Sequence, residues 1–448
     1  MNLIDNEEMK LAGQCLEMAL SKGADQVRIS LSKSVMNLVG TLNGEIDKVT
    51  HCFDRSMSFN LFVDNKYGSF STNRLEIDEI DRFLDEAVAT VRMLETDSHR
   101  ALPDPERTEK NAITGQELGI CDDAYNSITP ETRLSTALQA SIFKEIGEHD
   151  EWKIISEETE YSDNVNDLLI IDSNGLKCRH SETSFDFMAD MAIEDAEGNK
   201  YSGYWWDSYP FSGKLDCKSC CRKALERSIA QLHPEKCAGG KYNMVLDPDV
   251  SFKVASPVLS ALNAFSIQQN NSFLMESLGK RLFPEGLTIL DDCRTAGQSG
   301  CKMFDSEGVA TRTDAVIEDG VIKKYFLNTY MASKMGMEPT IEDATRPRIM
   351  PWPEPGLDRE KILGICGDGI LVTGFNGGNC NSATGDFSYG VEGFAFKDGK
   401  ITHPVHEMLI TGNFLTLWNG LIAAGDDFRP CMSKLIPTLA FRDVNFSA

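Results

Sequence analysis

This sequence has few positively charged residues. Its 448 residues include 44 Lys and Arg against 69 Asp and Glu, so the net charge is −25 at pH 7. A chain of that charge repels a phosphate backbone, and direct nucleic-acid binding is therefore disfavoured. The first ten residues also lack the basic start and apolar run of a secretory signal, because they contain Asp5, Glu7 and Glu8. We expect no export.

Long apolar runs and a disulfide pattern are missing as well. The longest apolar-looking segment, residues 413–425, is interrupted by Thr416 and Asn419 and is too short to span a bilayer. The 13 cysteines are an odd number spread over the whole chain, which suits reduced thiols better than a disulfide scaffold. We therefore expect a cytoplasmic protein that makes no membrane contact.

Histidine is absent between His233 and His403, a gap that covers most of the C-terminal half. An imidazole cannot serve there as a general base or as a metal ligand. The pair His406-Glu407 begins like a zincin motif, but Ile410 stands where the second histidine is needed. These residues give no catalytic group, no metal site and no cofactor.

The N-terminal half carries one pattern twice. Apolar residues at helical spacing over residues 6–21 and 76–94 bracket β-prone runs, which are divided by a hairpin signal at Asn43-Gly44. The same order returns with helical spacing over residues 132–146 and 214–232. The second turn signal, Asn174-Gly175, follows the first by 131 positions. A duplicated unit of helices and antiparallel strands is predicted.

The C-terminal half predicts a β-rich antiparallel domain. After a linker at residues 234–240, Asp319-Gly320 and Asp398-Gly399 each stand between two β-prone arms, a strong hairpin signal. The fold class is therefore α+β. The expected division is a first α+β unit at residues 1–112, a second at 113–235 and the β-rich domain at 236–448.

A run rich in Gly and Asn at residues 374–388 is the most distinctive loop. It matches neither G-x-G-x-x-G nor the P-loop pattern, and no Lys follows it. Such loops form tight turns or present backbone amides to an extended peptide. The peptide-binding residues expected on the second interpretation are Asn376, Gly377, Gly378, Asn379, Thr384, Gly385, Asp386, Phe387 and Ser388.

The same region carries a family resemblance. Thr384-Gly385-Asp386-Phe387-Ser388, Asp398-Gly399-Lys400 and Thr411-Gly412-Asn413 resemble the C-terminal signature of the TldD/PmbA family, often called modulators of DNA gyrase. The closing Ile436-Pro437-Thr438-Leu439 supports this, and the resemblance spans essentially the entire chain.

The resemblance implies one of two kinds of subunit. TldD-like chains carry an H-E-x-x-x-H zinc motif on a helix after the first strand of the C-terminal domain, with a later cysteine as third protein ligand. The equivalent stretch here, residues 252–261, has neither His nor Glu, and Cys431 is too close to the closing motif to be assigned. The chain therefore resembles the TldE/PmbA-type subunit.

Such a subunit implies a partner and a substrate. The resemblance implies a heterodimer with a TldD-like zinc metallopeptidase subunit and proteolysis of unfolded peptide substrates. Whether the chain forms a homodimer when the partner is absent stays open. Two alternatives stay open. One is an autonomous hydrolase that uses carboxylates such as Asp247, Asp249, Asp291 or Asp292, although Asp residues at strand ends are usually turn formers. The other is a peptide-binding regulatory homodimer without a peptidase partner.

Overall fold

Helix α1 (Asn6–Ser21) begins where the sequence supplies a complete N-terminal cap. In a computed structural model of the chain, which describes residues 2–147 and 149–448, the Asp5 carboxylate accepts hydrogen bonds from the amides of Glu7 and Glu8 at 2.8 and 2.9 Å. Glu8 in turn accepts the Asp5 amide at 3.0 Å. These bonds satisfy amides that the first turn of a helix leaves free, so the helix starts at this point.

The chain divides into two compact units. The first contains the residues up to Ile229 together with Arg294–Thr311, and the second contains Ala230–Cys293 and Arg312–Ala448. The elements of the first unit follow α1 in the order β1 (Gln26–Leu42), β2 (Glu45–Val63), β3 (Lys66–Thr72), α2 (Ile77–Met93), α3 (Pro130–Ala140), β4 (Trp152–Asp172), β5 (Lys177–Asp195), β6 (Lys200–Tyr209) and α4 (Cys217–Ile229).

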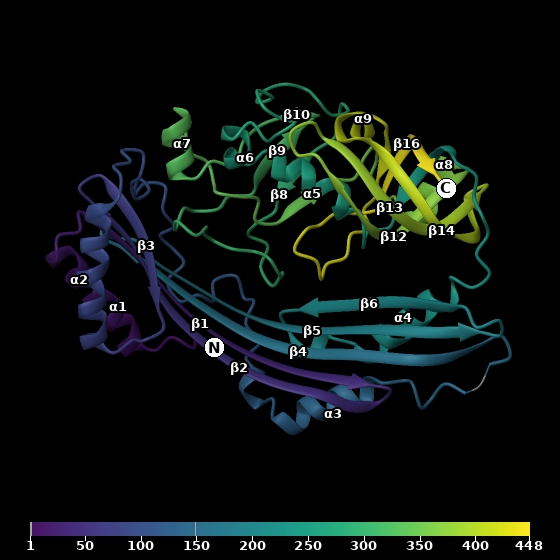
Figure 1. Cartoon of the computed structure of the whole chain (residues 1–448), viewed down its shortest axis with the longest axis horizontal. Coiled ribbons are helices and arrows are strands. Elements are labelled where there is room, and N and C mark those ends of the chain that lie inside the picture. The colour runs from purple at the N-terminus through teal and green to yellow at the C-terminus, as the bar shows by residue number, and fades with distance from the viewer. Residues whose placement is uncertain (1, 148) are drawn as a thin grey trace. The chain divides into compact units, whose positions relative to one another are not determined.

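The first unit repeats one helix–three strands–helix order, as the sequence predicts. Its six strands form one antiparallel sheet in the order β3-β2-β1-β4-β5-β6, so the two repeats meet through β1 and β4 (Figure 1). Both hairpin signals are confirmed, because Asn43-Gly44 joins β1 to β2 and Asn174-Gly175 lies between β4 and β5. The boundary expected between residues 112 and 113 therefore separates two repeats of one sheet, and the three-part division stays a prediction.

The two repeats differ along their outer strands. In the second repeat, β6 pairs only with Phe185–Glu194 of β5, and a preceding segment of the chain covers the rest of that edge. The amides of Arg179, Ser181 and Thr183 donate to the carbonyls of Ala112, Gly115 and Ile120 at 2.7, 2.8 and 3.0 Å. In the first repeat, β3 pairs only with Met57–Val63 of β2. Within the described residues, no strand lies on the outer edge of Glu45–Ser56.

The sheet of the first unit buries charged side chains as well as apolar ones. The Asp163 carboxylate on β4 accepts two hydrogen bonds from the Arg133 guanidinium, at 2.6 and 3.0 Å. Asp167, four residues further along β4, accepts hydrogen bonds from Arg179 Nε at 3.0 Å and from the Ile4 amide at 2.8 Å. Each charge is buried but matched by an opposite charge and further hydrogen bonds, which is the condition for tolerating it.

The second unit is β-rich, as expected. Its elements are β7 (Gly240–Leu246), α5 (Phe252–Ala261), α6 (Ala264–Gln268), β8 (Ile289–Asp291), β9 (Asp314–Glu318), β10 (Val321–Ile322), α7 (Thr329–Met335), β11 (Pro347–Ile349), α8 (Arg359–Cys366), β12 (Gly369–Cys380), β13 (Asp386–Lys397), β14 (Lys400–Asn413), α9 (Phe414–Asn419), β15 (Leu421–Ala424) and β16 (Leu439–Ser447). A small sheet has the order β10-β9-β8-β11. The larger sheet has the order β14-β13-β12-β7-β16-β15, and β14 also pairs with β16. The strands β7, β12, β13, β14 and β16 therefore close into a ring.

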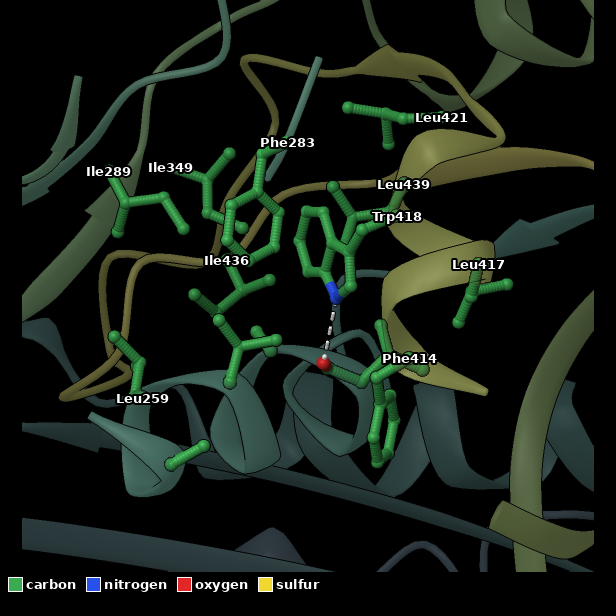
Figure 2. Packing of buried hydrophobic residues seen from close by; sticks show 14 of the residues in the cluster. Leu259, Phe283, Ile289, Ile349, Phe414, Leu417, Trp418, Leu421, Ile436 and Leu439 are labelled. Carbon is green, nitrogen blue, oxygen red and sulfur yellow. Dashed lines mark hydrogen bonds between the residues drawn. The ribbon is translucent and has the colours of Figure 1, made fainter. Parts of the chain in front are cut away.

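An apolar core fills the second unit. Figure 2 shows Trp418 of α9 among Phe283, Ile436 and Leu439, with its indole nitrogen donating to the Val254 carbonyl of α5 at 3.2 Å. That bond satisfies the one polar atom of the indole, so the ring can be fully buried. No helix in the described part of the chain is long and apolar enough to cross a membrane.

Candidate functional site

The hairpin formed by β12 and β13 contains the Gly- and Asn-rich run. Gly377 and Gly378 have φ values of +104° and +101°, in the left-handed region that favours glycine. They stand where the register of β12 shifts against β13, between Phe375 and Gly378. A Cβ atom on Gly378 would lie 2.1 Å from the Ser388 carbonyl oxygen, so no other residue fits without a backbone shift. The strand is bulged at this point because of these two residues.

The turn at the end of the hairpin uses its own amides. The Asn381 side chain accepts the amides of Ala383 and Thr384 at 2.9 and 3.2 Å, and the Gly385 amide donates to the Asn381 carbonyl at 2.7 Å. Backbone groups already bonded in this way are not available to a ligand. Only the strand that precedes the turn, β12, therefore remains a candidate for presenting amides to a peptide.

Asp386 ties the turn to the end of β14. Its carboxylate accepts Asn413 Nδ2 at 3.0 Å and the Thr384 hydroxyl at 2.7 Å. The Asn413 hydrogen bond, followed by that of Thr384, lowers the pKa of Asp386 below its ordinary value. The group is therefore an ionised structural acceptor, and it is not suited to act as a general acid.

Phe387 and Gly385 are buried. Phe387 is 5% exposed, and its ring lies 4.9 Å from that of Phe414 and 5.6 Å from that of Tyr389. A side chain packed in this way anchors the hairpin but cannot touch a peptide. Among the residues expected to bind peptide, those that remain on the surface before the turn are Asn376, Gly377, Gly378 and Asn379 of β12.

Half of β12 has an open edge. The parallel pairing of β7 with β12 covers only Gly369–Val372. The strand continues to Cys380 with β13 on one side, and no strand among the described residues pairs with its other side. An open edge with exposed polar residues can accept an extended peptide as an additional strand. This segment, Gly374–Cys380, is the candidate peptide edge.

Helix α5 offers nothing that fits a zinc ion. Val254, Val258 and Leu259 point into the apolar core, and the half-buried Ser256 hydroxyl is bonded to Lys434 Nζ at 3.1 Å. Zinc in proteins is held by imidazole, thiolate or carboxylate, and α5 contains none of them. Across the described residues, no group of three or more His, Cys, Asp or Glu is arranged to hold a metal. The residues present on this helix do not fit the zinc site of TldD-like chains.

Asp247 and Asp249, considered for an autonomous hydrolase, are ion-paired. Asp247 at the end of β7 accepts Arg359 Nη1 at 2.9 Å, and Asp249 is bonded to Arg429. Carboxylates held by guanidinium groups are typical of structural ion pairs. The sequence analysis missed these arginines because each lies more than a hundred positions from its partner and no local pattern connects them.

Asp291 and Asp292 are also held in place. Asp291 is buried and accepts the amides of Thr345 and Arg346 at 3.0 and 2.6 Å. Its burial raises its pKa above the ordinary value, although those two amides act in the opposite direction. Asp292 lies 3.7 Å from the Arg346 guanidinium and 3.8 Å from that of Arg348. The two carboxylates therefore bond to different groups, and neither is placed as an acid opposite the other.

Comparisons with known proteins match almost the whole chain. Models of the PmbA/TldA metallopeptidase family match domain 1 at residues 27–91, the central domain at 125–232 and the C-terminal domain at 239–448. The metalloprotease PmbA of Escherichia coli O157:H7 is 25% identical over 436 residues, which are 95% of this chain and 93% of that protein.

Two solved structures share the fold. One, from Bacteroides thetaiotaomicron VPI-5482, bears the provisional name of a modulator of DNA gyrase; it is 36% identical, with a TM-score of 0.93 and full coverage of both chains. The other is TldE from Thermococcus kodakarensis, 16% identical, with a TM-score of 0.83 and coverage of 98% of this chain and 100% of that one. The second likeness shows the fold alone.

Proposed function

The chain belongs to the PmbA/TldD family, and from this premise we propose that it is a TldE/PmbA-type subunit without a catalytic zinc site of its own. In this proposal it pairs with a TldD-like zinc metallopeptidase subunit, and the two chains degrade or process unfolded peptides. The scattered and mostly buried free thiols suit a reducing compartment, so the proposal locates this work in the cytoplasm.

The composition of α5 is the observation that carries the proposal. This helix follows the first strand of the second unit, which is where the resemblance places the zinc motif, and apart from Lys253 it contains only apolar and hydroxyl side chains. A metallopeptidase needs a metal to activate water, and a chain without ligands at that place needs another chain to supply them. The partner therefore contributes the metal chemistry, and this chain contributes binding surface.

The candidate peptide edge is the surface that we assign to the substrate. Asn376, Gly377, Gly378 and Asn379 would offer backbone groups to an extended peptide, which needs no side-chain specificity. The turn through Thr384 and Gly385, together with Asp386, Phe387 and Ser388, would hold that strand in place. Binding by backbone groups suits a substrate class defined by being unfolded.

Metal analysis of the purified chain tests the absence of a zinc site. We expect no stoichiometric zinc and no peptide cleavage by the chain alone, and cleavage when a TldD-like chain with an intact H-E-x-x-x-H motif is added. One tightly held zinc per chain would overturn the proposal. Cleavage by the isolated chain that is abolished by Asp247→Asn would favour the autonomous hydrolase.

Photo-cross-linking tests the peptide edge. A benzophenone amino acid at Asn379 should transfer label to an unfolded peptide, whereas the same group at Ile401, which is 48% exposed on β14, should not. Equal labelling at both positions would remove β12 from the proposal.

Affinity purification from a native extract tests the partner. Recovery of this chain without any chain that carries the zinc motif would favour the regulatory homodimer.

A further inference from the structure

The outer edge of β2 is open where the equivalent edge of β5 is covered. The regular part of this edge runs from Lys48 to Ser56, beyond a bulge at Asp47, where the register with β1 shifts. It contains no Pro or Gly. Val49 and Phe53 on it are 61% and 54% exposed, although β-branched and aromatic side chains usually pack against a neighbour. We call Lys48–Ser56 the open β2 edge.

Its sequence is complementary to itself when reversed. If two copies pair antiparallel about His51, Lys48 lies opposite Asp54 of the other copy, Val49 opposite Phe53, and Thr50 opposite Cys52. Opposite charges and apolar pairs placed directly across from one another stabilise a sheet, and like charges destabilise it. Moving the centre by one residue in either direction places Val49 against His51 or against Arg55, and both charge matches are lost.

We propose that this edge joins two copies of the chain around a two-fold axis at His51, so that two six-stranded sheets become one continuous sheet. A two-fold interface uses the same patch twice, which is what a self-complementary strand provides. Charges on an edge normally prevent pairing. Here their signs favour one register, because in the neighbouring ones Lys48 lies opposite Cys52 or Ser56 and loses its match with Asp54. Lys48 Nζ bonds to Glu160 on β4 of its own chain at 2.6 Å, across β1, so it exchanges this partner for Asp54 of the other copy when the two edges pair.

Contact at the open β2 edge is small. Pairing about His51 joins only Lys48–Asp54, seven residues per copy, well below the roughly 20–30 a side of a standard interface. We therefore expect a dissociation constant in the range of about 1 to 100 µM. The dimer does not depend on the proposed peptidase role, since it involves only the first unit.

Cysteine cross-linking tests the register. Residues directly opposite in an antiparallel pair have Cα atoms about 4.5–5.5 Å apart, which is within the range of a disulfide. In a Cys52→Ser background, His51→Cys should form a disulfide-linked dimer when diamide is the oxidant. The matched control Val49→Cys should not, because the two copies of that residue would be roughly 14 Å apart along the strand.

Charge exchange separates pairing from misfolding. Asp54→Lys alone faces Lys48 twice, and Lys48→Asp alone faces Asp54 twice, so sedimentation velocity should show each dimer weakened by about tenfold or more. An equal mixture of the two variants should restore the dimer, because both contacts then join opposite charges.

Three outcomes would overturn the proposal. The first is a monomer at all concentrations up to about 100 µM. The second is a dimer in which His51→Cys cross-links no better than Val49→Cys. The third is cross-linking of His51→Cys to a TldD-like chain in a mixture, with no link between copies of this chain.

Discussion

The two units of the molecule differ in what their cores contain. The first buries carboxylate–guanidinium pairs such as Asp163 with Arg133 beneath the centre of its sheet. The second encloses an apolar core around Trp418, and its buried carboxylates, such as Asp247 beside the partly exposed Arg359, lie at strand ends. The unit that carries the candidate peptide edge is therefore stabilised mainly by packing. The first unit also depends on the pairing of its buried charges.

The largest effect is expected from breaking a buried ion pair of the first unit. Asp167→Ala leaves the Arg179 guanidinium, 5% exposed, without this carboxylate and removes the acceptor of the Ile4 amide. We expect a loss of about 3–5 kcal/mol in the free energy of unfolding, since an uncompensated buried charge is costly. Hydrogen exchange of β4 and β5 should show the loss in the first unit. The control Asp186→Ala, half-buried on the same sheet, should cost less than about 1 kcal/mol.

A smaller effect is expected in the apolar core of the second unit. Trp418→Phe removes ring volume and the hydrogen bond to the Val254 carbonyl, which we expect to cost about 2 kcal/mol. Hydrogen exchange of α5 and α9 should increase while that of the first unit does not. A loss as large as that of Asp167→Ala would contradict the contrast between charged and apolar cores.

The smallest effect is expected on the stability of the first unit at low pH. Burial alone would raise the pKa of Glu109, but hydrogen bonds from the Asn111 amide and Arg294 outweigh it and lower the pKa below the ordinary 4.5. A depressed carboxyl pKa contributes stability above pH 4.5, and this contribution is lost as the pH falls through the folded value. Glu109→Gln should therefore cost about 1 kcal/mol at pH 7 and have a flatter loss of stability between about pH 5 and 3.

Denaturant titrations at several pH values measure this difference. Glu106→Gln, on the same segment but exposed, is the matched control and should retain the wild-type pH profile. If Glu109→Gln shows the same acid limb as the wild-type chain, the Arg294 pair does not stabilise the first unit.

Local patterns predicted the elements well and the long-range contacts poorly. The turns at Asn43-Gly44 and Asp398-Gly399 are where the sequence predicts them, because a two-residue hairpin is determined by its own backbone preferences. The helix at residues 132–146 was expected too late and too long, since α3 starts at Pro130 and ends at Ala140, before the Glu157 carboxylate accepts the Ile142 amide. A distant acceptor of this kind leaves no periodic signal.

In the candidate site, too, local features were predictable and long-range contacts were not. The apolar character of α5 and the family resemblance both follow from the sequence alone. That β7 covers only the first part of β12 could not be read, because it depends on strands more than a hundred positions apart. The sequence also did not predict that Arg294–Thr311 belongs to the first unit. This segment is held there by long-range hydrogen bonds, such as that from the Gly297 amide to the Leu118 carbonyl.

The meeting of the two repeats at β1 and β4 has a consequence for synthesis on the ribosome. All of β1 from Arg28 to Leu42 pairs with β4, and the latter strand emerges only after the whole first repeat and the connection that follows it. At ordinary elongation speeds the delay is on the order of ten seconds. For that time the nascent chain carries an unpaired edge along β1, and an unpaired strand edge is where partly synthesised chains aggregate most readily.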